Sequence, residues 1–188
     1  MPKNKLRKKL FQKNQSMSSE YKKLASAEVQ KTFLDINSLD KAKNILLYKD
    51  IKGEMPTDKI MLESQRMGIG VYFPVVADNY KLSLIKYLKG DRFKKNKYGI
   101  DEPEGSEQIN PENLSIAIVP FVGVDNNGYR LGNGGGYYDR LFGSLPERSD
   151  LVIAGLGFDY QIISDNFKED HDLKYDLVIT EKQKYFFK

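Results

Sequence analysis

The sequence predicts an α/β fold, and three observations support that class. Short runs rich in Ile, Val, Leu and aromatic residues, each bounded by turn-forming residues, read as strands at 44–48, 69–76, 114–120, 151–158 and 176–180. Segments with helical periodicity lie between them. The runs are apolar at consecutive positions, which is typical of a sheet covered by helices on both faces. Alternating strands and helices therefore predict a single three-layer domain over residues 1–188, with a mainly parallel sheet.

Two helices are expected before the first strand and two more between strands. The first is basic, because six of the first thirteen residues are Lys or Arg, and Leu6 and Leu10 give it an apolar stripe at i, i+4. The second is predicted over residues 19–36, where apolar residues repeat with a helical period. The later helices are predicted over 57–67 and 137–145.

Residues 89–113 are expected to be irregular. This stretch combines three glycines and two prolines with many charged residues. A loop of about 25 residues is unusual in a compact domain and is often functional.

Composition excludes several kinds of site. Hydrophobic residues make up 40% of the chain, which argues against disorder, and the absence of Cys excludes disulfides, a thiol nucleophile and Cys-ligated metals. No apolar run approaches about 18 residues, and the basic N-terminus lacks the apolar core of a signal peptide. We therefore expect a cytoplasmic protein with no membrane partner. The net charge of +4 suits an anionic small molecule as well as nucleic acid.

A cluster of glycines gives the strongest functional signal. Gly132, Gly134, Gly135 and Gly136 precede a predicted helix. Glycine reaches positive φ and has no side chain, so backbone N–H groups can approach a ligand closely, and a helix N-terminus adds further donors. Together these features favour a phosphate, although a flexible surface loop is the other interpretation. The spacing matches neither the P-loop nor the dinucleotide-binding fingerprint, which would need a glycine at Tyr137.

Charged residues flank the cluster. Arg130 and Arg140 bracket it with permanent positive charge suited to bidentate phosphate contacts. Asp139 could hold a magnesium ion that bridges phosphates, because magnesium takes few carboxylates and keeps waters. Asp139 could equally cap the following helix or pair with Arg140, and the residues alone leave these alternatives open.

The segment from Gly128 to Arg140, GYRLGNGGGYYDR, closely resembles the signature of the 5-formyltetrahydrofolate cyclo-ligase family, also called methenyltetrahydrofolate synthetases. That pattern reads roughly G-x-R-L-G-x-G-x-G-Y-Y-D, and every fixed position is present. Further similarity lies in KNKLR at 3–7, GEMPT at 53–57, YGIDEP at 98–103, the strand and turn at 119–128, and the C-terminal stretch at 161–181. Some members carry Lys at the position of Gly135 and an aromatic residue or Arg at that of Asn133.

The resemblance implies the residues of an active site. Arg130 and Asp139 would act in catalysis, Asp139 would be a magnesium ligand, and Glu54, Tyr98 and Tyr138 would bind the folate. The residues that would bind ATP lie in the first helix and the glycine-rich segment: Lys3, Arg7, Arg130, Leu131, Gly132, Asn133, Gly134, Gly135, Gly136, Tyr137 and Tyr138.

The implied activity is the ATP-dependent conversion of 5-formyltetrahydrofolate to 5,10-methenyltetrahydrofolate, with release of ADP and phosphate. Phosphorylation of the formyl oxygen would create a leaving group, and the N10 amine would then close the ring. The implied fold is like that of sugar-phosphate isomerases and CoA transferases. ATP and Mg²⁺ are the expected cofactors, and a folate, with or without a polyglutamate tail, is the expected partner of a monomer that binds no nucleic acid.

Other interpretations remain for several residues. A nucleic-acid-binding protein could use the lysine-rich N-terminus and residues 89–97, and a sugar-phosphate isomerase could share the fold. Taken alone, Glu54 would be a solvated acid in a turn, and His171, the one histidine, a surface or structural residue. The aromatic residues Tyr72, Phe73 and Tyr98 are expected mainly in the core, although one of them could line a folate pocket.

Overall fold

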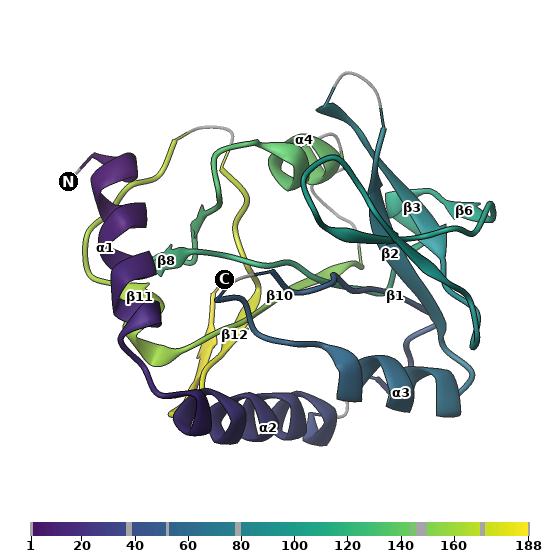
Figure 1. The fold of residues 1–188 in the computed structure, drawn as a ribbon, viewed down its shortest axis with the longest axis horizontal. Helices are drawn as coiled ribbons and strands as arrows, with labels where there is room; N and C mark the ends of the chain where they lie inside the picture. Colours follow the sequence, from purple (N-terminus) through teal and green to yellow (C-terminus); the bar gives the residue numbers. More distant parts are fainter. Residues whose placement is uncertain are drawn as a thin grey trace.

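The computed structural model describes residues 2–36, 39–51, 53–77, 80–143, 145, 150–169 and 172–187. Its main sheet consists of β1 (Asn44–Leu46), β2 (Gly70–Val76), β3 (Leu82–Lys86), β6 (Gln108–Ile109), β7 (Ile116–Ile118), β10 (Val152–Leu156), β12 (Leu177–Ile179) and β13 (Lys184–Phe186). The strand order is β13-β12-β10-β7-β1-β2-β3-β6 (Figure 1). The five predicted strands form its parallel centre, whereas the pairings with β13, β3 and β6 are antiparallel.

Helices cover both faces of this sheet. Helices α2 (Ser19–Asp35) and α3 (Asp58–Arg66) lie on one face, and α4 (Tyr137–Gly143) lies on the other (Figure 1). Successive residues of a strand pack against opposite helical layers. At β1, Ile45 and Leu47 pack with α2 and α3, whereas Leu46 packs on the side of α4. Burial on both faces explains why these strands are apolar at consecutive positions. The predicted layered α/β arrangement is confirmed.

The basic helix α1 (Lys3–Gln15) stands at the side of the molecule, next to a second, three-stranded sheet (Figure 1). That sheet has the order β11-β8-β9 and consists of β8 (Gly123–Asp125), β9 (Arg130–Leu131) and β11 (Ile162–Ile163). The predicted apolar stripe of α1, Leu6 and Leu10, is buried against Leu131 and Phe167. This packing places the N-terminal cations beside the segment that leads into the glycines.

The prediction of an irregular loop over 89–113 is wrong in part. Strands β4 (Phe93–Lys95) and β5 (Asp101–Pro103) form an antiparallel hairpin, and a 3-10 turn follows at Pro111–Asn113. The Phe93 ring packs edge-on against Phe73, with ring centroids 5.4 Å apart. The carboxylate of Glu102 accepts a hydrogen bond from the backbone N–H of Val76 at 2.8 Å, which ties the hairpin to β2. Tertiary contacts, rather than local propensity, therefore order this stretch.

The strand order defines where a ligand site is expected. From β1 the chain crosses through α3 to β2, whereas β7 lies on the opposite side of β1 and leads outward to β10 and β12. In open α/β sheets, ligands bind outside the carboxyl ends of the strands at such a change of direction. The segments that leave β1 and β7 here are the one containing Glu54 and the one containing the glycines.

Candidate active site

The glycine loop, residues 132–136, connects β9 to α4. Gly134 and Gly136 have φ values of +100° and +63°, a region that L side chains rarely adopt. Among the described residues, no acceptor is hydrogen-bonded to the backbone N–H groups of 132–136. The loop therefore presents a row of unpaired donors, an arrangement that binds anions.

Arg130 is buried beneath the glycine loop, with 6% of its surface exposed. Its Nε donates to the carbonyl oxygen of Pro120 at 2.7 Å, and its guanidinium lies over the Tyr138 ring, 5.3 Å from the centroid. A Cβ atom at Gly132 would come within 2.5 Å of the guanidinium, so a side chain at this position would have to displace Arg130. The orientation of the Arg130 charge is thus set before any ligand binds.

Asp139, in the first turn of α4, is the carboxylate partner of Arg130. Nη1 of Arg130 lies 3.3 Å and 3.5 Å from the two carboxylate oxygens, and the backbone N–H of Leu173 donates to Oδ1 at 3.1 Å. Of the alternatives that the sequence leaves open, an ion pair is the one observed, but its partner is Arg130 rather than Arg140.

A cavity of about 450 Å³ lies against the glycine loop. We call it the cation-lined cavity, because its walls carry four basic side chains together with three acidic ones: Lys3, Arg7, Arg130, Arg140, Asp139, Glu169 and Asp172. Leu131 also borders it, but its side chain is 1% exposed and belongs to the core under α1, so only its backbone can serve a ligand.

The two α1 cations differ in their partners. Nε of Arg7 donates to the carbonyl oxygen of Gly132 at 2.7 Å, which joins α1 to the glycine loop. Nζ of Lys3 lies 2.7 Å from Asp172 and 3.1 Å from Glu169. Burial alone lowers the pKa of Lys3, but hydrogen bonds and attraction from these two carboxylates raise it overall. The charge of Lys3 is therefore largely matched within the protein.

A second cavity, of about 430 Å³, shares Arg130, Gly135 and Gly136 with the first. We call it the tyrosine-lined cavity. Its aromatic walls come from five tyrosines, of which the last two are consecutive in α4: Tyr48, Tyr80, Tyr98, Tyr137 and Tyr138. Mostly apolar walls with a few polar groups are typical of small-molecule sites. The sequence interpretation missed Tyr48 and Tyr80 as site residues; Tyr48 is the last residue of the predicted strand 44–48, and that position at the carboxyl end was the available signal.

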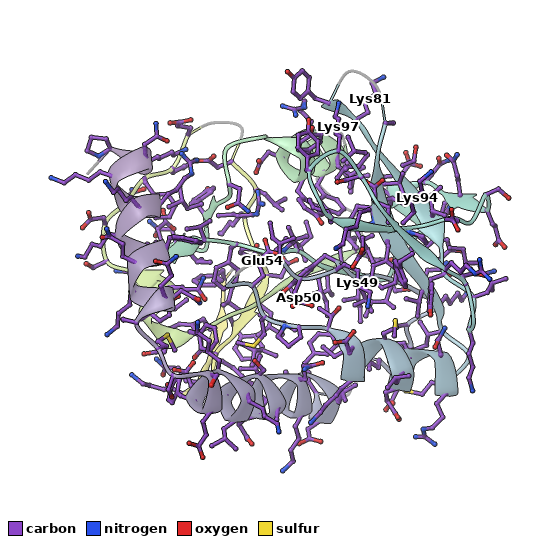
Figure 2. The ribbon with its side chains drawn as sticks, viewed as in Figure 1. Lys49, Asp50, Glu54, Lys81, Lys94 and Lys97 are labelled. Carbon is purple, nitrogen blue, oxygen red and sulfur yellow. The ribbon has the colours of Figure 1, made fainter. Side chains whose placement is uncertain are left out.

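Glu54 lies on the segment after β1 (Figure 2). It borders the tyrosine-lined cavity. Its Oε2 accepts a hydrogen bond from the backbone N–H of Ile51 at 3.1 Å, and Asn133 Nδ2 lies 3.5 Å from Oε1. Burial raises the pKa of this carboxyl from 4.5 to about 7. Glu54 is thus half-buried, whereas the sequence alone would favour a fully solvated turn acid.

The other aromatic residues considered from the sequence lie in different parts of the structure. Tyr72 and Phe73 are in the core as expected, but Tyr98 is 54% exposed, and its hydroxyl lies 3.2 Å from that of Tyr137. Tyr137 and Tyr138 face the tyrosine-lined cavity rather than the cation-lined one. His171 lies outside the described residues.

A layered α/β fold with a glycine loop between cationic and aromatic cavities is the arrangement expected of a phosphate-binding protein with room for a second, aromatic ligand. The chain belongs to the 5-formyltetrahydrofolate cyclo-ligase family, whose model matches residues 1–181. It is 31% identical over 175 residues to the 5-formyltetrahydrofolate cyclo-ligase of Haemophilus influenzae, covering 85% of this chain and 92% of that one. The Escherichia coli K12 enzyme of the same name is 28% identical over 145 residues, covering 74% and 78%.

Two solved structures share the fold. The 5,10-methenyltetrahydrofolate synthetase of Aquifex aeolicus superposes with a TM-score of 0.86 at 30% identity, covering 99% of this chain and 93% of that one. The Mycoplasma pneumoniae synthetase gives 0.79 at 24% identity, covering 96% and 99%. The family resemblance carried by the glycine-rich segment is confirmed, and the nucleic-acid-binding and isomerase alternatives find no support among these relatives.

Proposed function

We propose that this chain is an ATP-dependent ligase that converts 5-formyltetrahydrofolate to 5,10-methenyltetrahydrofolate, releasing ADP and phosphate. Membership of the cyclo-ligase family supports the reaction. The structural observation that carries it is the shared wall: Arg130, Gly135 and Gly136 border both cavities. A phosphate bound on one side of this wall would lie beside a folate bound on the other, which is the proximity that a transfer reaction needs.

ATP is assigned to the cation-lined cavity. The backbone N–H groups of residues 132–136 and the guanidinium groups of Arg7 and Arg130 would bind its phosphates. Lys3 would contribute less, because Asp172 and Glu169 already match its charge. Binding by backbone donors and preorganised cations suits phosphoryl transfer, in which the protein mainly positions groups and stabilises charge.

The folate is assigned to the tyrosine-lined cavity. Tyr98 and Tyr138 would contact its rings, and Glu54 would lie beside the reacting atoms. Because the pKa of Glu54 is about 7, its carboxylate can accept a proton near neutral pH and release it again.

The reaction would proceed in two steps. The formyl oxygen attacks the γ-phosphorus of ATP, forming an O–P bond as the bond to ADP breaks. The N10 amine then attacks the activated formyl carbon, the C–O bond breaks, and the former formyl oxygen leaves within inorganic phosphate. The proton lost from N10 passes to Glu54. No protein nucleophile is required, in keeping with a chain that contains no Cys.

Magnesium is assigned to Asp139, whose carboxylate borders the cation-lined cavity. The residues fit a site completed by phosphates and water, because magnesium takes few protein carboxylates; the described residues contain no cluster of three acidic or His ligands. The ion would neutralise phosphate charge.

Asp139→Asn should raise the magnesium concentration needed for half-maximal activity more than it lowers the melting temperature. Early melting with normal magnesium dependence would instead assign Asp139 to positioning Arg130.

The remaining assignments follow from the chemistry of the site. We propose a cytoplasmic monomer formed by one domain, which accepts folates with or without a polyglutamate tail, binds neither nucleic acid nor membrane, and shares its architecture with sugar-phosphate isomerases and CoA transferases. No helix among the described residues is long and apolar enough to cross a membrane.

The test of the proposed function is coupled turnover. Purified protein should consume ATP only when 5-formyltetrahydrofolate is present, and the absorbance of the methenyl product should rise in step with ADP. ATP consumption that is independent of the folate, or none with it, would contradict the assignment.

A further inference from the structure

Arg140, one turn into α4, folds back over the glycine loop. Its Nη2 donates to the carbonyl oxygen of Gly135 at 2.5 Å, and Nε and Nη2 each lie 3.4 Å from the carbonyl oxygen of Tyr80. The guanidinium also lies 5.6 Å from the ring centroids of both Tyr80 and Tyr137. A Cβ atom at Gly136 would be 2.7 Å from Nη1, so the guanidinium lies where a side chain at Gly136 would otherwise project.

Among the residues that the structure describes, no negative charge matches that of Arg140. Its contacts are two carbonyl oxygens and two ring faces, and no carboxylate among the described residues pairs with it. In the same cavity Lys3 has two carboxylate partners and Arg130 has Asp139. In the described part of the chain, Arg140 and Arg7 are therefore the two basic residues of the cation-lined cavity that have no carboxylate partner. An anionic ligand would supply the negative charge that each of them lacks.

The position of Arg140 indicates which phosphate it would meet. It borders Gly135 and Gly136, which line both cavities, whereas Arg7 contacts the loop at Gly132 and lies beside Gly134, and neither of these glycines lines the tyrosine-lined cavity. If the cation-lined cavity holds ATP and the tyrosine-lined cavity holds the folate, only the γ-phosphate of ATP need reach the shared wall, because it is the group that is transferred. The tyrosine rings hold the guanidinium there before the nucleotide binds, which lowers the entropy cost of the contact.

We propose that Arg140 binds the γ-phosphate of ATP and so serves as the specificity residue that distinguishes ATP from ADP. This inference rests on the proposed function for the identity of the nucleotide. Arg140 projects from α4 and supplies a positive charge beside the glycine loop. Gly135, which has no side chain, cannot supply that charge itself.

The test compares the affinities of a non-hydrolysable ATP analogue and of ADP, measured by calorimetry on the full chain with magnesium present. In Arg140→Ala the dissociation constant of the analogue should rise roughly 10- to 100-fold, the loss expected for a charge-assisted hydrogen bond, while that of ADP changes less than about threefold. Arg92→Ala is the matched control, because Arg92 is exposed and borders neither cavity, and it should change neither constant.

Two further variants keep the proposal falsifiable. Arg140→Lys, which retains charge but loses the planar fork, should show the same selective loss with a smaller factor, and it replaces the alanine variant should that fail to fold. In the double variant Arg140→Ala, Gly135→Lys, a cation returns to the shared wall from a residue whose φ is not positive. Its Cβ would lie 2.8 Å from the Tyr137 ring, so that ring must shift, and affinity for the analogue should recover in part.

Equal losses for the ATP analogue and ADP, or no loss for either, would overturn the γ-phosphate assignment. The outcome is separable from that of the proposed function, because binding is measured without folate. A protein that binds the analogue through Arg140 yet shows no folate-dependent ATP consumption would retain this inference and lose the reaction.

Discussion

Arg130 is a buried cation whose surroundings fix it in one orientation. Burial of a charge costs free energy unless partners compensate, and here Asp139, the carbonyl oxygen of Pro120 and the Tyr138 ring do so. Because all of these contacts are made by protein groups, the guanidinium needs little reorganisation to meet developing phosphate charge. Fixed charge of this kind is the part of the site that we expect to matter most for rate.

Loss of either Arg130 or Arg7 should therefore slow turnover sharply. We expect Arg130→Ala and Arg7→Ala each to cost about 2–4 kcal/mol of transition-state stabilisation in kcat/KM. Lys9→Ala is the appropriate control, because Lys9 is exposed and borders no cavity, whereas Lys8 borders a neighbouring cavity with Arg7. Similar losses in all three variants would indicate a general electrostatic surface instead of a site.

Glu54 should make stability depend on pH. Its pKa is 4.5 when unfolded and about 7 when folded, so the folded state holds the proton more tightly. The stabilisation is full below pH 4.5 and is lost as the pH rises through about 7. Relative to Glu54→Gln, the free energy of unfolding of the wild type should fall by up to about 3 kcal/mol between pH 4.5 and pH 7.

Chemical denaturation of both proteins at pH 5 and pH 8 measures this difference. The comparison with Glu54→Gln removes contributions from other titrating groups such as Asp50, whose pKa burial also raises. Parallel pH profiles for wild type and variant would show that Glu54 is solvated.

At the scale of single residues, the sequence predicted which residues belong to the site better than it predicted their burial and their contacts. The signature located Arg130 and Asp139, and the similarity at 53–57 located Glu54, but burial and partners depend on segments that meet only in the fold. Thus Lys3 was expected to be available to phosphate and is paired with Asp172, while Tyr98 was expected mainly in the core and is exposed.

At the scale of elements, the glycine loop combines conformation with close packing. Gly136→Val should abolish turnover and weaken ATP binding by at least about tenfold, because a side chain there needs a positive φ and meets Arg140. Gly90→Val separates the two causes: Gly90 also has a positive φ, at +102°, but nothing lies within 4 Å of its would-be Cβ.

Both glycine variants should lose about 1–2 kcal/mol of stability from the strained backbone. Only Gly136→Val should lose nucleotide affinity, measured by calorimetry on folded protein. Unchanged affinity in that variant would remove the loop from the nucleotide site.

Among the elements, those buried on both faces were predictable and those at edges were not. The runs at 44–48 and 151–158 are apolar because helices cover them, and a local pattern reveals this. Strands β4 and β5 are short and partly exposed, and they form because Phe93 and Glu102 contact β2. Such strands depend on partners distant in sequence, which no local pattern reports.

At the scale of the whole molecule, the site depends on strand order. The segment after β7 leads through β8 and β9 to the glycine loop, Glu54 follows β1, and Arg7 comes from a helix packed on the small sheet. These segments meet because β1 and β7 are neighbours from which the chain winds in opposite directions. The alternation of elements predicted the parallel centre of the sheet, but strand order is a property of long-range pairing and was not predictable from the sequence.

The neighbouring cavities make a prediction about the path of one oxygen atom. If the shared wall brings the formyl oxygen against the γ-phosphate, that oxygen must leave within inorganic phosphate. Substrate labelled with heavy oxygen at the formyl group should therefore give labelled phosphate, one label for each methenyl product, as measured by mass spectrometry. A route in which ATP hydrolysis only drives a conformational change would place a solvent oxygen in the phosphate. Unlabelled phosphate accompanied by methenyl product would overturn direct activation while leaving family membership intact.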